Sequence, residues 1–237
     1  AFESVTASSR GVTVVQRGQS EQALALIGAD GVWSIVRDRL FPEVRPRFTG
    51  RIAWRGTIDA GQLPGAFDTR SVHLWMGANA HMVVYPISGG RRINVVAVVT
   101  DTWNKLGWNE PGEAAEVARH FAAWPDAARA LIGAVVSWRK WALFGMPDGG
   151  VWSKGNVALL GDAAHAMLPF VAQGAGMAIE DAAVAARCLA DAEGDAVAAF
   201  ARYAALRAPR VTRVQRAARH TGRIYHLGGV AGFARNQ

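Results

Sequence analysis

The segment spanning residues 155–182, GNVALLGDAAHAMLPFVAQGAGMAIEDA, restricts the fold of this chain more than any other. Residues 155–161 form an apolar run between glycines, which predicts a short buried strand that ends at Asp162. Pro169 predicts a rigid bend after this strand, and the Gly-Ala-Gly run at 174–176 opens a long Ala-rich helix. A strand, a turn and a helix in this order indicate part of an α/β domain.

The same segment carries groups that suit a bound cofactor. A carboxylate at the tip of a strand can accept hydrogen bonds from the hydroxyls of a sugar or ribitol chain. The start of the helix offers free N–H groups at its positive end, and small residues let a ligand approach the backbone closely. Such groups would stabilise a developing negative charge. We interpret Glu180 and Asp181, deeper in the helix, as structural or solvated, and His165 as a hydrogen-bonded structural histidine.

A second strand–turn–helix pattern occupies residues 26–37, LIGADGVWSIVR. Its Gly-rich turn would expose backbone N–H groups at the positive end of the next helix, where an anion such as a pyrophosphate can bind. Asp30 could accept hydrogen bonds there, directly or through water. The alternative is an ordinary connection in which Asp30 caps the helix. By itself this pattern does not identify a site.

Hydrophobic periodicity predicts an α/β domain interrupted by an insertion that carries an antiparallel sheet. Strand patterns dominate the middle of the chain, where Ser88-Gly89-Gly90 predicts a hairpin turn. The predicted strands cover residues 12–16, 23–27, 52–58, 71–76, 81–86, 92–99, 135–144 and 155–161. The predicted helices cover residues 33–40, 111–123, 126–133, 174–191 and 195–222, with Pro111 in a first-turn position.

A formal net charge of +7 raises the question of a nucleic-acid partner. Much of the excess comes from arginines that recur every three to five residues in the last predicted helix, namely Arg202, Arg207, Arg210, Arg213, Arg216, Arg219 and Arg223. Charge alone gives only nonspecific binding, and no reading motif accompanies it. We therefore favour a solvated helix face, or one that docks on acidic chain outside this sequence, over nucleic acid.

The remaining composition narrows the class of protein further. The chain is 51% hydrophobic and only 19% charged over 237 residues, which excludes a disordered chain. The single cysteine, Cys188, cannot form an intrachain disulfide, and its Ala-rich helix predicts an inert buried thiol. No apolar run reaches the roughly 20 residues of a membrane helix, and no zinc-ligand spacing occurs. We expect a cytoplasmic protein with no membrane partner and no metal.

Together, GADGVWSIVR and GDAAHAMLPFVAQGAGMAIEDA resemble the second and third fingerprints of the flavin-dependent aromatic hydroxylases, which are single-component FAD monooxygenases related to salicylate hydroxylase. The resemblance covers essentially the whole chain. It implies that NADH or NADPH reduces FAD, and that O₂ then supplies a hydroxyl group to a small aromatic acid with release of water. The implied cofactor contacts are Asp30 near the pyrophosphate, Gly161 and Asp162 at the ribityl chain, and Pro169, Gly174, Ala175 and Gly176 at the isoalloxazine.

The sequence departs from this family pattern in two respects. The family's first fingerprint, a strand followed by G-x-G-x-x-G, does not occur, so we expect a fragment that begins inside the FAD-binding domain and is inactive alone. Gly176 stands where many relatives carry Asn, which removes one side-chain contact. The resemblance implies an incomplete Rossmann-like FAD domain at 1–45 and 146–237, the latter including the C-terminal helices. Residues 46–145 would form the inserted substrate domain with its antiparallel sheet.

The string AHMVVYP places His81 and Tyr85 on one side of a predicted strand, both toward a cavity or both toward the core. It resembles H-x-x-x-Y-P in hydroxylases of 3-hydroxybenzoate and 6-hydroxynicotinate, where the pair lies at the substrate and the His helps to remove the phenolic proton. A phenolate is more electron-rich than a phenol, and histidine titrates near neutral pH. We take the two residues as the candidate catalytic pair. The alternative is a structural His beside a core Tyr.

Two other functions remain open. One is a non-catalytic binding module, either a flavoprotein remnant or a basic docking domain, which the absent first fingerprint and the Arg-rich helix favour. The other is a sibling flavoenzyme, such as an epoxidase or a prenyl-chain reductase. The sequence also leaves open the aromatic ring, the choice between NADH and NADPH, and whether the protein is a homodimer.

Overall fold

The computed structural model describes residues 2–8, 11–64, 67–68, 70–149 and 152–237 and divides into two compact units. The first unit comprises Ala1–Arg47 and Phe144–Thr221, and the second comprises Phe48–Leu143 and Gly222–Gln237. The sequence grouped all of 146–237 together, whereas residues 222–237 pack in the second unit. The reason is a pair of hydrogen bonds: the Asn79 N–H donates to the His226 carbonyl (3.2 Å), and the Arg235 guanidinium donates to the Met76 carbonyl (3.3 Å).

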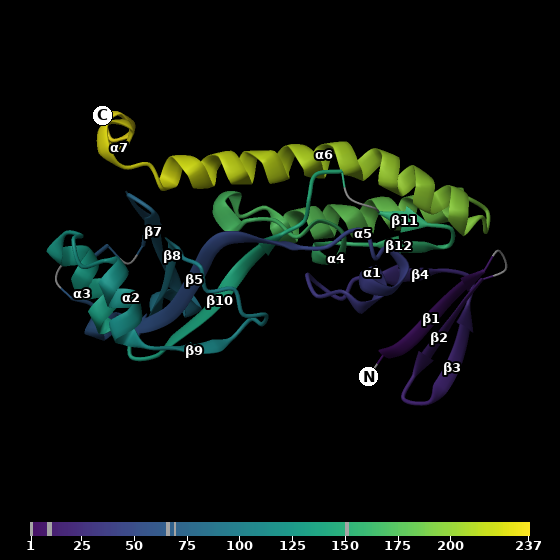
Figure 1. Ribbon diagram of the computed structural model, residues 1–237, viewed down its shortest axis with the longest axis horizontal. Helices are drawn as coiled ribbons and strands as arrows, with labels where there is room; N and C mark the ends of the chain where they lie inside the picture. Colours follow the sequence, from purple (N-terminus) through teal and green to yellow (C-terminus); the bar gives the residue numbers. More distant parts are fainter. Residues whose placement is uncertain (1, 9–10, 65–66, 69, 150–151) are drawn as a thin grey trace. The chain divides into compact units, whose positions relative to one another are not determined.

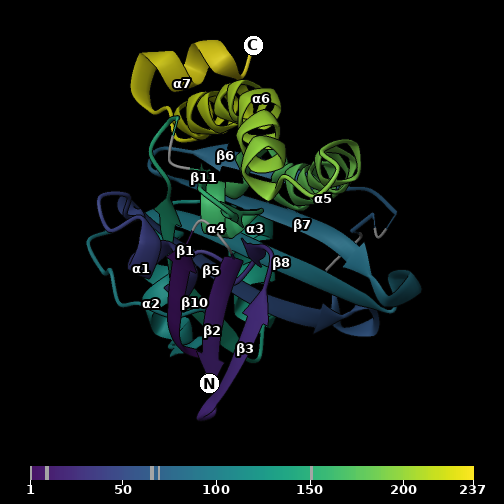
Figure 2. The ribbon, with the colours of Figure 1, turned by 90° about the vertical axis from the view of Figure 1, so that its right-hand side faces the viewer.

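The first unit contains two small sheets and several helices. The strands of one sheet are antiparallel and lie side by side in Figure 2: β1 (Phe2–Ser8), β2 (Gly11–Gln16) and β3 (Gln19–Ala23). The other sheet has the order β11 (Ser153–Lys154), β12 (Val157–Leu159), β4 (Leu26–Gly28). The helices are α1 (Ile35–Leu40), α4 (Asp162–His165), the 3-10 turn η3 (Pro169–Val171), α5 (Gly174–Asp191) and α6 (Ala196–Tyr225), whose last residues fall in the second unit.

The single strand predicted at 23–27 is two strands in different sheets. Asn156 causes the break, because its side-chain amide donates to the carbonyls of Ser8 and Leu24, both at 3.2 Å. The Leu26 N–H then donates to the Asn156 carbonyl at 3.0 Å. The chain therefore leaves β3 at Ala23 and enters β4 at Leu26.

Small side chains on α5 and aromatic ones on α6 build the core of the first unit. Met177, Ala185 and Cys188 are buried on α5, and they belong to the same apolar cluster as Phe200 and Tyr203 of α6. The buried position of Cys188 confirms the prediction of a buried thiol.

The second unit is built on a six-stranded sheet with the order β6-β7-β8-β5-β10-β9 (Figure 1). The strands are β5 (Arg47–Asp59), β6 (His73–Gly77), β7 (Ala80–Ile87), β8 (Arg92–Thr100), β9 (Glu110–Gly112) and β10 (Trp138–Gly145). The helical segments are η1 (Ala60–Gln62), η2 (Ser88–Gly90), α2 (Ala114–His120), α3 (Asp126–Ala134) and α7 (Gly229–Arg235). Ile87 pairs with Arg92 across η2, which confirms the predicted hairpin.

The prediction that Pro111 starts a helix is wrong. Pro111 lies in β9 opposite Arg139 of β10, and α2 begins only at Ala114. β9 is the last strand of the sheet, and a proline, which has no N–H to donate, is tolerated on such an edge.

The two faces of this sheet differ in character. On one face, the side chains of the sheet include Met82 and Val84 of β7 and Trp54 of β5. They pack with side chains of α2 and α3 in a single apolar cluster. The residues that alternate with these point to the opposite face, which carries polar side chains. The polar residues of this face include Arg51, Arg55, Thr57, His81, Tyr85, Asn94 and Thr100.

The arginines of α6 find acidic partners within the chain itself. The ion pairs are Arg202–Asp191, Arg207–Glu180, Arg207–Asp181, Arg210–Glu180, Arg216–Asp148 and Arg219–Asp148. The sequence suggested a solvated face or acidic chain elsewhere. For these arginines, α5 and the loop before β11 supply the acids, so much of the basic charge is neutralised locally.

Candidate functional site

The two strands that carry the sequence motifs are neighbours. β4 and β12 pair in parallel with Gly28 opposite Leu159, and the Leu160 N–H donates to the Gly28 carbonyl at 2.9 Å. Parallel strands end at the same edge of a sheet, so Asp30 and Asp162 both follow the carboxyl ends of adjacent strands. This edge is where open α/β sheets bind their ligands. The fold therefore brings the two motifs together.

A tight turn presents Asp162 at this edge. Gly161 has φ 61° and ψ −138°, which glycine adopts readily, and its carbonyl accepts hydrogen bonds from the N–H groups of Ala164 and His165. Asp162, half-buried, is the first residue of α4. Burial raises the pKa of its carboxyl group, against the lowering effect of His165. Within the described part of the chain nothing donates a hydrogen bond to this carboxylate, so its oxygens can accept ligand hydroxyls.

The first turn of α5 is also open to a ligand. Gln173 at the N-cap makes no capping hydrogen bond with its side chain, and the first amides of a helix have no partner within it. These amides belong to Gly174, Ala175 and Gly176. A Cβ on Gly174 would meet no atom within 4 Å. Pro169 begins η3 just before this turn, as the predicted rigid bend.

Asp30 caps α1. One carboxylate oxygen accepts hydrogen bonds from the N–H groups of Ile35 (2.7 Å) and Val36 (3.2 Å), and Ser34 Oγ accepts from the Arg37 N–H (2.9 Å). The first-turn amides of α1 are therefore satisfied within the chain. The hydrogen bonds match the capping alternative, and contact of Asp30 with a pyrophosphate stays a prediction.

Arg37 was not singled out from the sequence, yet it links the two motifs. Its side chain is fully buried and donates to the carbonyls of Val32 (2.8 Å) and Ala163 (3.1 Å). The signal in the sequence that could have indicated its burial is that Arg37 directly follows Val36, an apolar residue that is buried on the same short helix. We regard Arg37 as a structural residue whose hydrogen bonds connect the turn after β4 to α4.

In the second unit, His81 makes a contact that the sequence did not predict. Its Nδ1 lies 2.7 Å from Nε2 of His226, just after α6, and its ring meets that of Tyr225 edge-on, with centroids 5.3 Å apart. Nδ1 of His226 lies 3.5 Å from Oγ1 of Thr100. Because 145 positions separate the two histidines, no spacing pattern could have identified His226.

Tyr85 shares a face of β7 with His81, as the spacing predicted, and that face is opposite the apolar cluster. Tyr85 is half-buried and pairs with Asn94 of β8, whose side-chain oxygen accepts a hydrogen bond from Nε of Arg55 at 2.9 Å. The pair therefore does not point into the hydrophobic core. Its contact with a substrate stays a prediction.

Protonation of the two paired histidines is disfavoured. Burial lowers the pKa of His81, and the charge that a protonated His226 would carry and the positive charge of Arg51 lower it further. Burial likewise lowers the pKa of His226, with Arg51 and Arg235 adding to the effect. Both rings are therefore neutral near pH 7, and one donates the hydrogen bond that the other accepts.

We expect this pair to make the protein less stable in acid. The ordinary histidine pKa is about 6.5, and below it the unfolded chain binds protons that the folded pair excludes, so the free energy of unfolding falls. One such histidine contributes a slope approaching about 1.4 kcal/mol per pH unit. Urea unfolding from pH 7.5 to 5 measures it. The double variant His81→Gln, His226→Gln should flatten the slope, and an unchanged slope in that variant contradicts the assignment.

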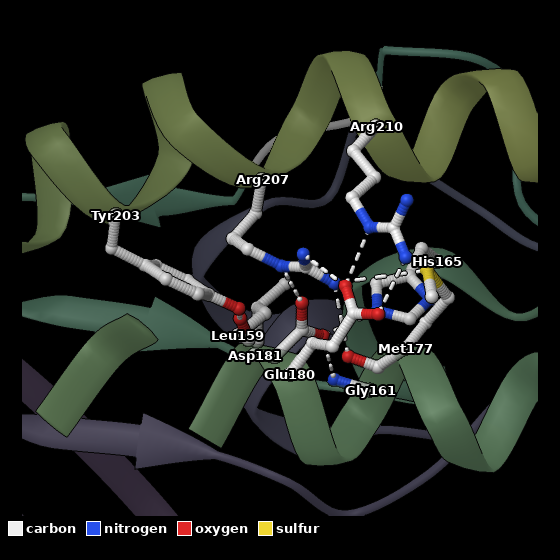
Figure 3. A network of polar contacts seen from close by, with 9 residues as sticks. All are labelled: Leu159, Gly161, His165, Met177, Glu180, Asp181, Tyr203, Arg207 and Arg210. Atoms are coloured by element: carbon white, nitrogen blue, oxygen red, sulfur yellow. Dashed lines mark hydrogen bonds and ion pairs between the residues drawn. The ribbon is translucent and has the colours of Figure 1, made fainter. Parts of the chain in front are cut away.

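A network of polar groups includes the N–H of Gly161, the residue before Asp162 (Figure 3). Asp181 of α5 is fully buried; it accepts hydrogen bonds from the Gly161 N–H (3.1 Å) and from Nε of Arg207 (2.7 Å), and lies 2.5 Å from Nε2 of His165. Burial acts to raise the pKa of Asp181, but its bonds to His165, Arg207 and Gly161 outweigh this, so the pKa is lowered. The sequence suggested a structural or solvated Asp181; it is structural and not solvated.

Across the ranges that the structure describes, no group of three or more His, Cys, Asp or Glu side chains is placed to hold a metal ion. Within the same ranges, no helix has both the length and the apolar character needed to cross a membrane.

Comparison with known proteins identifies the family of the chain. The family described as FAD binding domain matches residues 2–218. The chain is 42% identical over 211 residues to 3-amino-4-hydroxybenzoate 2-monooxygenase of Streptomyces platensis, covering 89% of the chain and 53% of that protein. It is 35% identical over 235 residues to 3-hydroxybenzoate 6-hydroxylase 2 of Aquipseudomonas alcaligenes, covering 99% and 73%. A solved substrate complex of salicylate hydroxylase matches with a TM-score of 0.86 at 29% identity, over 95% of this chain and 61% of that chain.

The matched residues include both motifs and most of the fold. The chain spans about half the length of the first relative, and the family match includes both motifs and the sheet of the second unit. The structural match confirms the predicted mixed α/β fold with an antiparallel insertion and C-terminal helices.

Proposed function

The chain belongs to the FAD-binding-domain family of the flavin-dependent aromatic hydroxylases, and we propose that it takes part in the hydroxylation of a small aromatic acid or phenol. In this reaction one atom of O₂ enters a ring C–H bond as hydroxyl, the other leaves as water, and NADH or NADPH is oxidised. The two curated relatives are named for the hydroxylation of substituted hydroxybenzoates, which supports this substrate class.

The observation that carries the proposal is the edge where β4 and β12 end. A half-buried carboxylate with no donor among the described residues suits the hydroxyls of a ribityl chain, which makes Asp162 the ligand we assign to it. The uncapped amides at 174–176 suit the acceptor atoms of an isoalloxazine, because a helix start offers donors and positive potential. When bound, FAD would supply the electron transfer to O₂ that amino-acid side chains cannot perform.

In the second unit, we assign to His81 the role of accepting the proton that leaves the substrate hydroxyl. Burial and neighbouring positive charge lower its pKa, which keeps the ring neutral near pH 7 but also makes it a weak base, so the phenolate that it helps to form needs stabilisation by charge. The positive charge of Arg51 nearby favours an anion, and a phenolate formed there would be stabilised by it. Tyr85, on the same face, is assigned a hydrogen bond to the substrate.

The direct test uses the protein expressed from its whole reading frame. We expect absorption bands in the near ultraviolet and blue from FAD, and oxidation of NADH or NADPH that depends on the aromatic compound. A panel of hydroxybenzoates, phenols and N-heteroaromatics, with product identification, defines the substrate and separates a hydroxylase from an epoxidase or a reductase. A protein that binds no FAD when titrated with it contradicts the proposal. The proposal includes a cytoplasmic location, and light scattering would decide whether the protein is a homodimer.

Substituting Gly174 by alanine should separate stability from cofactor binding. A helical Gly→Ala change raises stability by about 0.5–1 kcal/mol, and the new Cβ meets no protein atom within 4 Å. The same Cβ would occupy space assigned to the flavin, so affinity for FAD should fall by on the order of tenfold. Urea unfolding of the FAD-free protein and a fluorescence titration measure the two effects.

The matched control for this substitution is Gly133→Ala. Gly133 lies in α3, and its Cβ would also meet nothing within 4 Å. It should gain similar stability and keep the affinity for FAD. If Gly174→Ala binds FAD as tightly as Gly133→Ala does, the start of α5 is not the flavin contact.

A further inference from the structure

We infer that Asp181 is a positioning residue of the cofactor site, which holds the turn at Gly161 and Asp162 in the shape that receives the ribityl chain. The inference rests on the proposed function, because it assumes that Asp162 binds FAD. Asp181 itself lies within α5, behind the turn, and is fully buried.

The hydrogen bonds at Gly161 show how the turn is held (Figure 3). Its carbonyl accepts from the N–H groups of Ala164 (3.0 Å) and His165 (2.9 Å), and its own N–H donates to Asp181 (3.1 Å). Both backbone polar groups of Gly161 are thus engaged, one by α4 and one by α5. The side chain of Asp162 branches from the next residue, so a rotation about Gly161 would move its carboxylate.

The conformation of Gly161 needs such support. Its φ of 61° with ψ of −138° is sparsely populated by residues other than glycine, and glycine is free to leave it when nothing holds it. The bond to Asp181 is the one that joins this peptide to a different helix, 20 positions along the chain. Asp181 therefore restricts the turn where glycine alone would leave it mobile.

Arg207 of α6 in turn fixes Asp181. Its Nε donates to one oxygen of Asp181 at 2.7 Å, and its other nitrogens donate to Glu180 (2.6 Å) and to the Met177 carbonyl (3.2 Å). Arg210 binds Glu180 from the exposed side. Three acceptors on α5 thus orient the guanidinium, which leaves the second oxygen of Asp181 directed at Gly161 and His165. A carboxylate held this way is a rigid acceptor.

The test replaces Asp181 by asparagine, which keeps the shape but removes the charge and one acceptor. The affinity for FAD should fall about tenfold or more, as measured by flavin fluorescence titration. Hydrogen exchange of the FAD-free protein supplies a second readout. Peptides covering 157–165 should exchange faster, because the Gly161 amide loses a charged acceptor.

A matched control distinguishes positioning from general destabilisation. Tyr203→Phe removes another buried hydrogen bond in the same core, from the Tyr203 hydroxyl to the Leu159 carbonyl at 3.0 Å, but leaves Gly161 untouched. It should keep FAD affinity within about twofold. If Asp181→Asn does not fold, Arg207→Lys keeps a positive charge and loses the multiple contacts. That variant should weaken FAD binding and speed exchange at 157–165 in the same direction, though less.

The outcomes separate this inference from the proposed function. A wild-type protein that binds no FAD contradicts the function, and the inference falls with it. If the wild-type protein binds FAD and Asp181→Asn binds it with the same affinity, the positioning role is contradicted and the proposed function is not. The same holds for Arg207→Lys where that variant is used. An equal loss of affinity in Tyr203→Phe at equal loss of stability would also overturn it, since core stability would then explain the effect.

Discussion

Replacing Asp162 by alanine is expected to leave the protein colourless and unable to retain FAD. The carboxylate is half-buried, and nothing in the described part of the chain donates a hydrogen bond to it, so its interactions are available to the ligand. Hydrogen bonds to a charged group contribute about 1.5–3 kcal/mol each, and the loss of two corresponds to a factor of about 10² to 10⁴ in affinity. Absorbance after purification and a FAD titration measure it.

The stability of the same variant tells binding apart from folding. Because burial raises the pKa of Asp162, its ionised form is disfavoured in the FAD-free protein, and alanine should leave the free energy of unfolding unchanged or higher. Asp191→Ala is the control, since Asp191, the last residue of α5, is another aspartate of the first unit but pairs with Arg187 and Arg202. That variant should stay yellow. A fully yellow Asp162→Ala protein would show that the ribityl chain lies elsewhere.

The second large effect is expected for His81→Gln, which should lower kcat by about 10²- to 10⁴-fold while FAD stays bound. Glutamine can keep a hydrogen bond to His226 but cannot accept the substrate proton. The loss should shrink for a substrate whose hydroxyl is already ionised at the assay pH, such as a nitro-substituted phenol, because no proton then needs to be removed. Steady-state kinetics with both kinds of substrate measure the difference.

Two comparisons can contradict this prediction. His73→Gln changes a histidine of β6, whose Nε2 contacts the Asp68 carbonyl, and it should leave kcat unchanged. A His81→Gln protein with the wild-type kcat would show that His81 is a structural histidine, the alternative that its buried contact with His226 supports. An equal loss with ionised and neutral phenols would show that His81 orients the substrate without removing its proton.

Much of the local structure was predictable because it depends on short-range patterns. The α5 helix has the predicted bounds, and every strand of the large sheet except β9 was predicted, because their apolar residues alternate, although β5 begins five residues before the predicted strand at 52–58. The prediction at Pro111 failed because pairing with β10 on a sheet edge overrides the preference of proline for a first helical turn. The prediction of one continuous strand at 23–27 was wrong because the side chain of Asn156, which is remote in sequence, divides it.

The sequence by itself determined the two motifs, the family and the residue types that we propose to face a ligand, because each of these follows from neighbours along the chain. The partners of the buried polar groups were decided only by the tertiary structure. His226 reaches His81 across 145 positions, Arg37 reaches Ala163 across 126, and Asp181 reaches Gly161 across 20. A buried polar group must be satisfied by whatever the fold brings beside it, and no local pattern records which residue that is.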